Sequence, residues 1–467
     1  MRQDPAPEGW RSLLRREWIA TLAVLLGGVL LQSMNVLMLT TVLPSIVGEL
    51  GGVAMLSWPT TAFLASSIVA ASCAGMLAAA VGARAAYCVG VTTFGVGALL
   101  CSLATSMGWI VVGRLIQGFG GGLEAAAAYV AVRATFPEAV WSRTIALMST
   151  SWSMSVLLGP LVGGMFARFG NWRSAFVATA AVAGTLAVSA FFILPPGTPG
   201  RRTPSTAMPA GRVGLICVAI AAMSLASIVE SPLAKTALIV FAIGALATML
   251  LLDRTAAAPL LPSDAFSFDT PTGMGLWLAL LLCITFSPLQ IYVPIFLQRL
   301  HGLDPLAAGF AVASGSLGWT IASLTTAGAS GRWPDRLMSA GPALMGISLI
   351  TIALLLPSDA GALALVPAIV ALGMGIGQCW PFVAHRIMSG AKAGNEVVAA
   401  SSVPTVQQTG FALGAALAGV VATASGFSAG VADDNMMRAA FWVPASFVVP
   451  AALACAASLR LHRLRKP

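Results

Sequence analysis

Residues 108–133, GWIVVGRLIQGFGGGLEAAAAYVAVR, decide the fold class. The stretch is long and apolar enough for one membrane-spanning helix, which needs about 20 residues. Yet it carries Arg114, Gln117 and Glu124, which hydrocarbon disfavours. Together with Gly121 they follow at i, i+3, i+7 and i+10, so all four share one face of a helix. That face must contact protein or a water-filled cavity, because an ionised group in lipid costs several kcal/mol.

The composition of the whole chain is also that of a membrane protein. Of its 467 residues, 58% are hydrophobic and only 9% are charged, which excludes an ordinary soluble domain. The net charge of +9 arises from short basic clusters between apolar segments. This arrangement fits lipid head groups and membrane topology better than nucleic acid. The seven cysteines lie inside apolar stretches without a CxxC pair, so we expect neither disulfides nor a metal site.

The apolar segments predict an all-α integral membrane protein with fourteen spans. An even number of spans puts both termini on one side, and 19 of the 25 basic residues fall on that side. This bias places both termini in the cytoplasm. The predicted parts are a cytoplasmic N-terminal tail (1–18), a six-helix bundle (19–195), a cytoplasmic linker (196–212), two extra transmembrane helices (213–252), a second cytoplasmic linker (253–272), a second six-helix bundle (273–458) and a basic cytoplasmic tail (459–467).

The two predicted bundles echo each other in sequence. Residues 75–80 align with residues 331–336, and VLPSIVGEL at 42–50 is echoed by YVPIFLQRL at 292–300. Internal repeats are typical of transporters whose binding site lies between two halves. We therefore expect two pseudo-repeats with a two-helix insertion between them, although twelve spans remain the alternative to fourteen.

Three motifs carry a family resemblance. Residues 114–118 read RLIQG, residues 159–176 begin GPLVGG and end NWRSAF, and residues 292–309 begin YVPIFLQ and end GLDPLAAG. In this order they are similar to the major facilitator superfamily, and more narrowly to its fourteen-helix drug:proton antiporter branch of the EmrB/QacA type. The resemblance implies a secondary active transporter that exports small amphipathic molecules or drugs by alternating access. It also implies gating and helix-packing roles for Gly159, Pro160, Gly163, Gly164, Asp335 and Arg336.

The sequence departs from that branch at two places. The branch carries an acid in its first span where this chain has Asn35, and charged residues where Ala79 and Ala80 stand. The second-half copy of this loop keeps Asp335 and Arg336, which predicts one gating ion pair instead of two. These departures keep open an alternative function, a proton-uncoupled facilitator or an importer of a small metabolite with the same fold.

Depth along the helices indicates which polar groups can meet. At about 1.5 Å per residue, Arg114 and Asn35 lie at similar depths near the outer face, so we expect a hydrogen bond between them. Glu124 is about 15 Å further along the axis, too far to pair with Arg114, and it is the only acid deep within a span. A lone carboxyl in a low dielectric can load and release protons as access alternates. We therefore predict proton coupling by Glu124, Arg114 and Asn35; the alternative is a structural Glu124.

Amide and aromatic side chains inside the spans predict a substrate cavity. An apolar cavity with a few amides suits amphipathic organic molecules, although each such residue is equally able to serve as a helix contact. The predicted cavity residues are Gln117, Gln290, Tyr292, Trp319, Gln378, Trp380 and Gln407.

Other classes of function find no support in the sequence. The chain has no GxxxxGK[ST] motif for ATP, and a membrane-embedded enzyme would need paired carboxylates or a His/Asp cluster, which we do not find. We expect no cofactor and no metal, with the proton gradient as the driving force. The expected partners are a small-molecule substrate, protons and the lipid bilayer, together with a periplasmic adaptor protein. The expected location is the inner (plasma) membrane.

Overall fold

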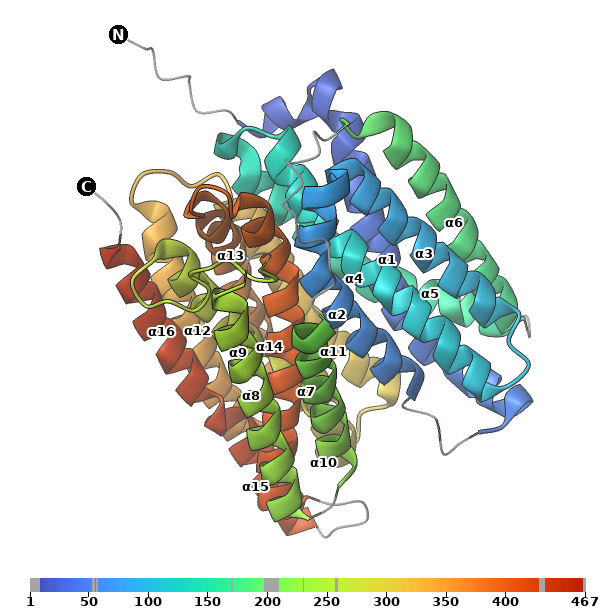
Figure 1. Ribbon diagram of the computed structural model, residues 1–467. Helices are drawn as coiled ribbons and strands as arrows, with labels where there is room; N and C mark the ends of the chain where they lie inside the picture. The colour runs from blue at the N-terminus through green and yellow to red at the C-terminus, as the bar shows by residue number, and fades with distance from the viewer. Residues whose placement is uncertain are drawn as a thin grey trace. The chain divides into compact units, whose positions relative to one another are not determined.

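The structure, a computed structural model, describes residues 9–52, 55, 58–168, 171–196, 210–229, 231–256, 259–427 and 433–464. Every regular element among them is an α-helix or a 3-10 helix, which confirms the predicted all-α fold. The α-helices (Figure 1) are α1 (Arg16–Leu50), α2 (Trp58–Val81), α3 (Ala83–Ser102), α4 (Met107–Thr135), α5 (Trp141–Arg168), α6 (Trp172–Ile193), α7 (Ala210–Ile228), α8 (Pro232–Arg254), α9 (Pro271–Ile291), α10 (Val293–Leu300), α11 (Pro305–Thr326), α12 (Trp333–Leu355), α13 (Val366–Ser389), α14 (Glu396–Ala424), α15 (Asp433–Ser446) and α16 (Val448–Arg463).

Thirteen helical segments of the described residues are long and apolar enough to cross a membrane. One of them joins α9 to α10 across Tyr292, where the helix is interrupted. The break lies just before Pro294, which has no N–H to donate to the carbonyl four residues back. The fourteenth predicted crossing is α7, whose apolar stretch Gly211–Met223 is shorter than a full span, so the number fourteen stays a prediction. Residues 197–209 of the predicted linker lie outside the described residues.

The chain divides into two compact units. Unit 1 holds residues 1–213, 253–263 and 391–405, and unit 2 holds residues 214–252, 264–390 and 406–467. Unit 1 therefore contains α1 to α6 and the first turns of α14, whereas α9 to α13, most of α14, α15 and α16 belong to unit 2. The hairpin of α7 and α8 packs through alanines within unit 2.

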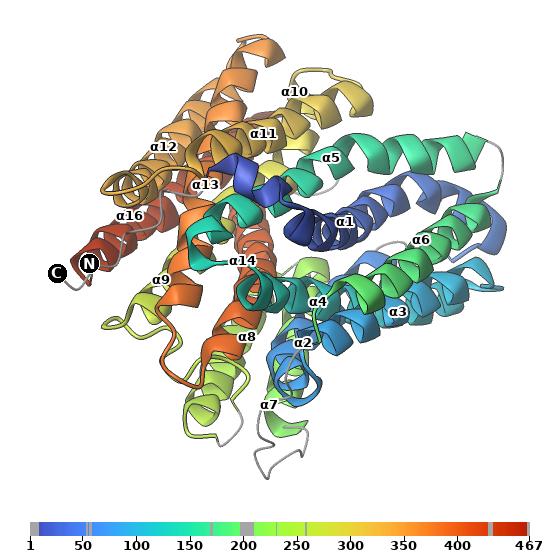
Figure 2. The ribbon, with the colours of Figure 1, turned by 90° about the horizontal axis from the view of Figure 1, so that it is seen from above.

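Glycines set the packing at the centre of unit 1, where α4 lies against both α2 and α3 (Figure 2). A Cβ added to Gly118 or Gly122 would collide with the α2 backbone at Phe63 and Ser67. One added to Gly120 would collide with the α3 backbone at Phe94. Only glycine allows helices to approach this closely. The α4 face that carries the predicted functional residues is therefore held tightly inside a three-helix layer.

Unit 2 repeats this packing with different residues. Here α13 contacts both α11 and α12. A Cβ on Gly373 or Gly377 would collide with the α11 backbone at Gly315 or Trp319. The two units therefore share one arrangement of a glycine-bearing helix on its neighbours, as expected for the predicted pseudo-repeats.

Candidate functional site

Arg114 is the centre of a polar cluster inside unit 1, and its side chain is fully buried. Its Nη1 donates to Oδ1 of Asn35 at 2.5 Å and to Oε1 of Gln117 at 2.7 Å. Its Nε donates to the Pro59 carbonyl at 3.4 Å, and its guanidinium lies 4.2 Å from the centre of the Phe63 ring. The predicted contact between Arg114 and Asn35 is therefore present. Among the described residues, neutral groups rather than a carboxylate hold this buried cation.

Glu124 lies on the same helix in a different environment. Its side chain is 3% exposed, and neither carboxylate oxygen has a hydrogen-bond partner among the described residues. The nearby hydroxyl of Tyr87 donates instead to the Val24 carbonyl at 2.9 Å. A Cβ on Gly28 would collide with both that hydroxyl and Glu124, so this glycine leaves the room they occupy. Beside them lies a cavity of about 10 Å³, lined also by Gln32, which is the space of about one water molecule.

The helices α1 and α5 approach each other closely at Gly159 and Gly163, as expected from their predicted packing roles. A Cβ on Gly159 would lie 2.6 Å from Cβ of Leu37, and one on Gly163 would collide with the hydroxyl of Thr41. The hydroxyl of Ser155 lies 2.5 Å from that of Ser33. The two helices are thus joined by a buried hydrogen bond.

One other residue of this motif, Gly164, differs from the prediction. A Cβ on Gly164 would meet nothing within 4 Å, so the packing role predicted for Gly164 is wrong. The reason is helical rotation, because the residue after Gly163 is turned about 100° away from α1. The side chain of Pro160 lies outside the described part of the chain.

The loop motif of unit 2 forms an ion pair with a partner that we did not predict. Asp335 is 4% exposed, and it accepts a hydrogen bond from Nη2 of Arg386 at 2.8 Å. Nδ1 of His462 lies 3.3 Å from its other oxygen. Arg336 instead lies over the ring of Trp333, at 5.5 Å from its centre. The predicted pairing of Asp335 with Arg336 is wrong, because adjacent residues of a helix do not face each other.

The predicted cavity residues of unit 2 fall into separate groups. Trp319 packs against Phe286 and Trp380, with ring centres 5.5 and 6.1 Å apart, and Phe286 contacts Phe411 at 6.5 Å. The indole N–H of Trp319 is buried and has no hydrogen-bond acceptor among the described residues. Unit 2 therefore contains an aromatic cluster with one unused donor.

The remaining predicted cavity residues lie elsewhere. Tyr292 belongs to a second aromatic group with Phe296 and Phe427, and Gln290 is exposed. The side chains of Gln378 and Gln407 are half-buried, whereas Gln117 is fully buried against Arg114. Of the predicted cavity residues, the structure brings Trp319 and Trp380 into direct contact.

Comparison with known proteins identifies the family. The model of the Major Facilitator Superfamily matches residues 25–415. This chain belongs to the major facilitator superfamily. A relative from Mycobacterium tuberculosis (strain H37Rv), named "Probable multidrug-efflux transporter", is 34% identical over 98% of this chain and 97% of its own length. The tetracenomycin C resistance and export protein of Streptomyces glaucescens is 27% identical over 87% of this chain and 76% of its own length.

A solved structure shares the fold of this superfamily member. The human organic anion transporter MFSD10 (TETRAN) superposes with a TM-score of 0.71, covering 95% of this chain and 99% of its own, at 13% identity. This likeness supports the fold alone. The family match and the apolar helices make the protein a multi-pass membrane transporter and not an enzyme.

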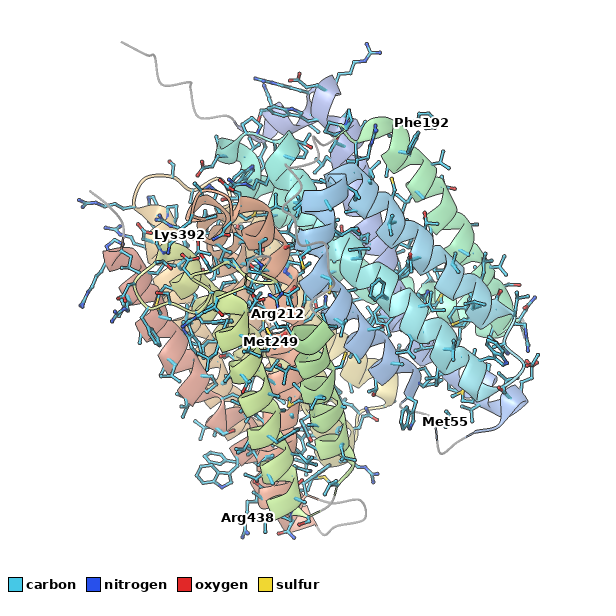
Figure 3. All side chains as sticks on the ribbon, viewed as in Figure 1. Met55, Phe192, Arg212, Met249, Lys392 and Arg438 are labelled. Atoms are coloured by element: carbon cyan, nitrogen blue, oxygen red, sulfur yellow. The ribbon has the colours of Figure 1, made fainter. Side chains whose placement is uncertain are left out.

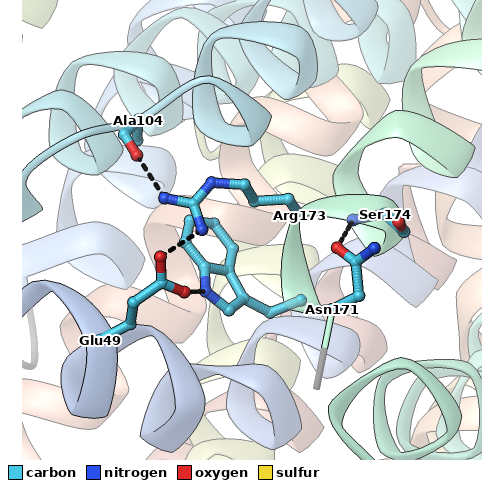
Figure 4. A network of polar contacts seen from close by, with 6 residues as sticks. Glu49, Ala104, Asn171, Arg173 and Ser174 are labelled. Carbon is cyan, nitrogen blue, oxygen red and sulfur yellow. Dashed lines mark hydrogen bonds and ion pairs between the residues drawn. The ribbon is translucent and has the colours of Figure 1, made fainter. Parts of the chain in front are cut away.

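The sequence did not predict a polar network at the end of unit 1 where α1 meets the start of α6 (Figure 4). Glu49, at the end of α1, accepts hydrogen bonds from Nη1 of Arg173 at 2.6 Å and from Nε1 of Trp172 at 2.7 Å. Arg173 also donates to the Ala104 carbonyl at 3.0 Å. The bonds from Arg173 and Trp172 hold the pKa of the Glu49 carboxyl below its ordinary value. The sequence did contain an indication of this network, because residues 171–173 begin the NWRSAF motif, for which no contact partner was predicted.

Proposed function

We propose that this superfamily member exports small amphipathic organic molecules, including drugs, by proton antiport and alternating access. Relatives named for multidrug efflux and for export of tetracenomycin C support the substrate class and the direction. The observation that carries the proposal is that the buried carboxyl of Glu124 has no hydrogen-bond partner among the described residues. A transporter driven by protons needs a group that accepts a proton on one side and releases it on the other.

The surroundings of Glu124 fit such a group. An ionised carboxylate that lacks hydrogen bonds is costly in an apolar interior, whereas its protonated form is tolerated. The adjacent cavity has room for about one water molecule, which can carry the proton to or from the carboxyl. The carboxyl therefore changes between a protonated state when the bundle is closed around it and an ionised state when water or a cationic substrate reaches it.

Arg114 has a supporting role in this proposal. About 15 Å along α4 separates it from Glu124, so the carboxylate is not neutralised by a permanent ion pair. Hydrogen bonds to Asn35 and Gln117 hold the guanidinium in place. The positive charge therefore acts on the proton at Glu124 from a distance, as a fixed charge in a medium of low dielectric.

A second candidate function is facilitated transport without protons. Asn35 favours it, because the related antiporter branch has an acid at this position and Asn35 cannot ionise. In this case Glu124 is a structural residue, and a substrate crosses down its own gradient through the same fold.

The orientation of the chain is part of the proposal. The excess of Arg and Lys on the side of both termini supports cytoplasmic termini in a plasma membrane. The helix ends that carry Arg84, Arg133 and Arg143 then face the cytoplasm, and Glu49 faces outward.

Transport by Glu124→Gln protein in proteoliposomes tests the proposal. Glutamine keeps the shape of the side chain but cannot ionise. We expect pH-gradient-driven uptake of a neutral amphipathic dye to fall to the background, while exchange of dye across the membrane without a gradient persists. Glu138→Gln, which changes an exposed acid of the loop after α4, is the matched control. Gradient-driven transport at the wild-type rate in the Glu124→Gln protein would reject proton coupling through this residue and favour the facilitator.

A further inference from the structure

A second cavity lies at one end of unit 1, away from Glu124. Its volume is about 200 Å³, against about 10 Å³ for the cavity beside Glu124. It lies where the start of α3 meets the ends of α4 and α6, and its lining includes Arg84, Thr135 and Leu194. Its walls are otherwise alanines and prolines. Neither the Arg114 cluster nor Glu124 uses this cavity.

Arg84 brings a positive charge whose hydrogen-bonding capacity is largely unused. Its Nη1 donates to the Phe191 carbonyl at 3.3 Å, and its guanidinium lies 5.3 Å from the centre of the Phe191 ring. A guanidinium has five N–H donors, and no acidic side chain of the described residues pairs with this one. Several donors of Arg84 are thus available to a ligand in the cavity.

Two further donors border the same space. The hydroxyl oxygen of Thr135 is buried without a hydrogen-bond partner among the described residues. Other hydroxyls of unit 1 donate to a carbonyl one turn back along their helix, as Thr144 of α5 and Thr179 of α6 do. The first turn of α3 has neither a side-chain cap nor an acidic residue, so its free N–H groups are also directed at this end. The three features all favour an anion.

The outer surface beside the cavity is strongly apolar. Phe191 and Phe192, on the last turn of α6, are 56% and 78% exposed, and Figure 3 shows Phe192 projecting away from the helices. Val81, just before the cavity on α2, is also exposed. Such a surface suits acyl chains. The cavity beside it is basic, and basic pockets between transmembrane helices on the cytoplasmic side bind anionic lipid head groups.

We propose that this cavity binds a phosphate group, with Arg84 and Thr135 as its ligands and the start of α3 as a further donor. The apolar flank favours a phosphate that belongs to a phospholipid of the inner leaflet, whose chains lie along Phe191 and Phe192. Free inorganic phosphate has the same chemistry and is the other source of such an anion. The site shares no residue with Glu124 or Arg114, and only its assignment to the inner leaflet rests on the orientation given under the proposed function.

Lipid binding to the purified full-length protein tests this site. Delipidated wild-type protein is titrated with phosphatidylglycerol, and bound lipid is counted by native mass spectrometry. We expect Arg84→Gln to weaken binding of one lipid by at least about tenfold, the effect of losing one charge-assisted hydrogen bond. Thr135→Val, which keeps the side-chain shape, should weaken the same lipid by a smaller factor. A separate titration with inorganic phosphate, followed by thermal unfolding, distinguishes the two sources.

Arg143→Gln is the matched control, because Arg143 is a partly exposed arginine that also donates to a backbone carbonyl, that of Ala139. Equal loss of lipid in the Arg84 and Arg143 variants, or no loss in either, overturns the site. Stabilisation of the wild type by inorganic phosphate but not by lipid, lost in Arg84→Gln, supports the anion site and assigns it a soluble ligand. Unfolding of lipid-free Arg84→Gln at the wild-type temperature shows that the variant is folded.

Discussion

The central helices of the two units pack alike but carry different chemistry. Gly118 and Gly122 of α4 lie against α2 in the way that Gly373 and Gly377 of α13 lie against α11. When these glycines are matched, three polar residues of α4 correspond to buried apolar ones of α13. The correspondences are Arg114 with Ile369, Gln117 with Leu372, and Glu124 with Cys379.

This difference separates the tasks of the two units. Glycine spacing sets how closely the helices pack in both units. Among the described residues, α4 carries a fully buried arginine and a buried glutamate inside that packing, where α13 has Ile369 and Cys379. Unit 2 offers an aromatic cluster around Trp319 in their place. We infer that proton chemistry belongs to unit 1 and that unit 2 supplies an apolar, aromatic surface for an organic substrate.

The largest effect is expected from the feature that the two units share. Gly122→Val and Gly377→Val each place a branched side chain against the backbone of the neighbouring helix, at Ser67 and Trp319. Overpacking without room to relax should cost about 3 kcal/mol or more and remove folded protein from the membrane in both variants. The yield of monodisperse protein after extraction measures this. Gly244→Val on α8 is the control, because a Cβ there meets nothing within 4 Å; a normal yield of either core variant contradicts the shared packing.

The next effect should separate the units. Arg114→Leu leaves the oxygens of Asn35 and Gln117 without a donor and should cost about 3 kcal/mol of stability. Ile369→Leu, at the matching place in α13, changes only shape and should cost less than about 1.5 kcal/mol. Thermal unfolding in one detergent compares the two variants. Equal destabilisation would mean that the polar cluster of α4 stabilises the protein only through packing and not through its hydrogen bonds.

Much of this fold could be predicted from the sequence, because a membrane span is a local property. The apolar runs indicate the helices, and a uniform rise per residue was sufficient to place Arg114 beside Asn35. The glycine at 163 was also a correct indication of close packing on α1. Properties that depend on depth and local composition are therefore accessible without coordinates.

Contacts that depend on helix rotation and on distant segments of the chain could not be predicted from the sequence. Asp335 pairs with Arg386 on α13 and with His462 on α16, both far along the chain. Gly164 points away from the helix that Gly163 touches. Tyr87 lies beside Glu124 only because α3 packs on α4, although it is one of just three tyrosines in the chain. Each of these contacts depends on how two helices are turned toward each other.

A smaller effect is expected from the aromatic cluster of unit 2. Trp319→Phe keeps a ring against Phe286 but removes the buried N–H that has no acceptor among the described residues. If this donor binds substrate, KM should rise about three- to tenfold for substrates that carry a hydrogen-bond acceptor, since one hydrogen bond contributes about 1 kcal/mol. Initial transport rates over a substrate panel measure it.

The matched control for this prediction is Trp442→Phe, because Trp442 on α15 is largely exposed. KM for substrates without an acceptor should stay unchanged in both variants. A uniform rise in KM across the panel would indicate that Trp319 acts only through its shape, and the aromatic cluster would then be part of the core.

The smallest effect concerns the end of unit 1 that carries Glu49, where the two units differ once more. Glu49 aligns with Arg299 in the repeat of 42–50 with 292–300, so the acid that binds Arg173 has no counterpart in unit 2. Glu49 lies beyond the candidate span Arg16–Leu39 of α1. Its pKa is lowered from the ordinary value of 4.5, first by the hydrogen bond from Arg173 and then by that from Trp172.

A lowered pKa means that folding favours the ionised carboxylate, so its stabilisation is complete above pH 4.5 and is lost as the pH falls through the lowered pKa. Glu49→Gln should therefore unfold at a slightly lower temperature than the wild type at pH 7, and this difference should vanish in acid. It should be small, because the pair is exposed to solvent and screened by salt. Arg299→Gln serves as the control and should show no such convergence. A Glu49→Gln deficit that stays constant from pH 7 to acid would mean that shape, and not charge, joins α1 to α6.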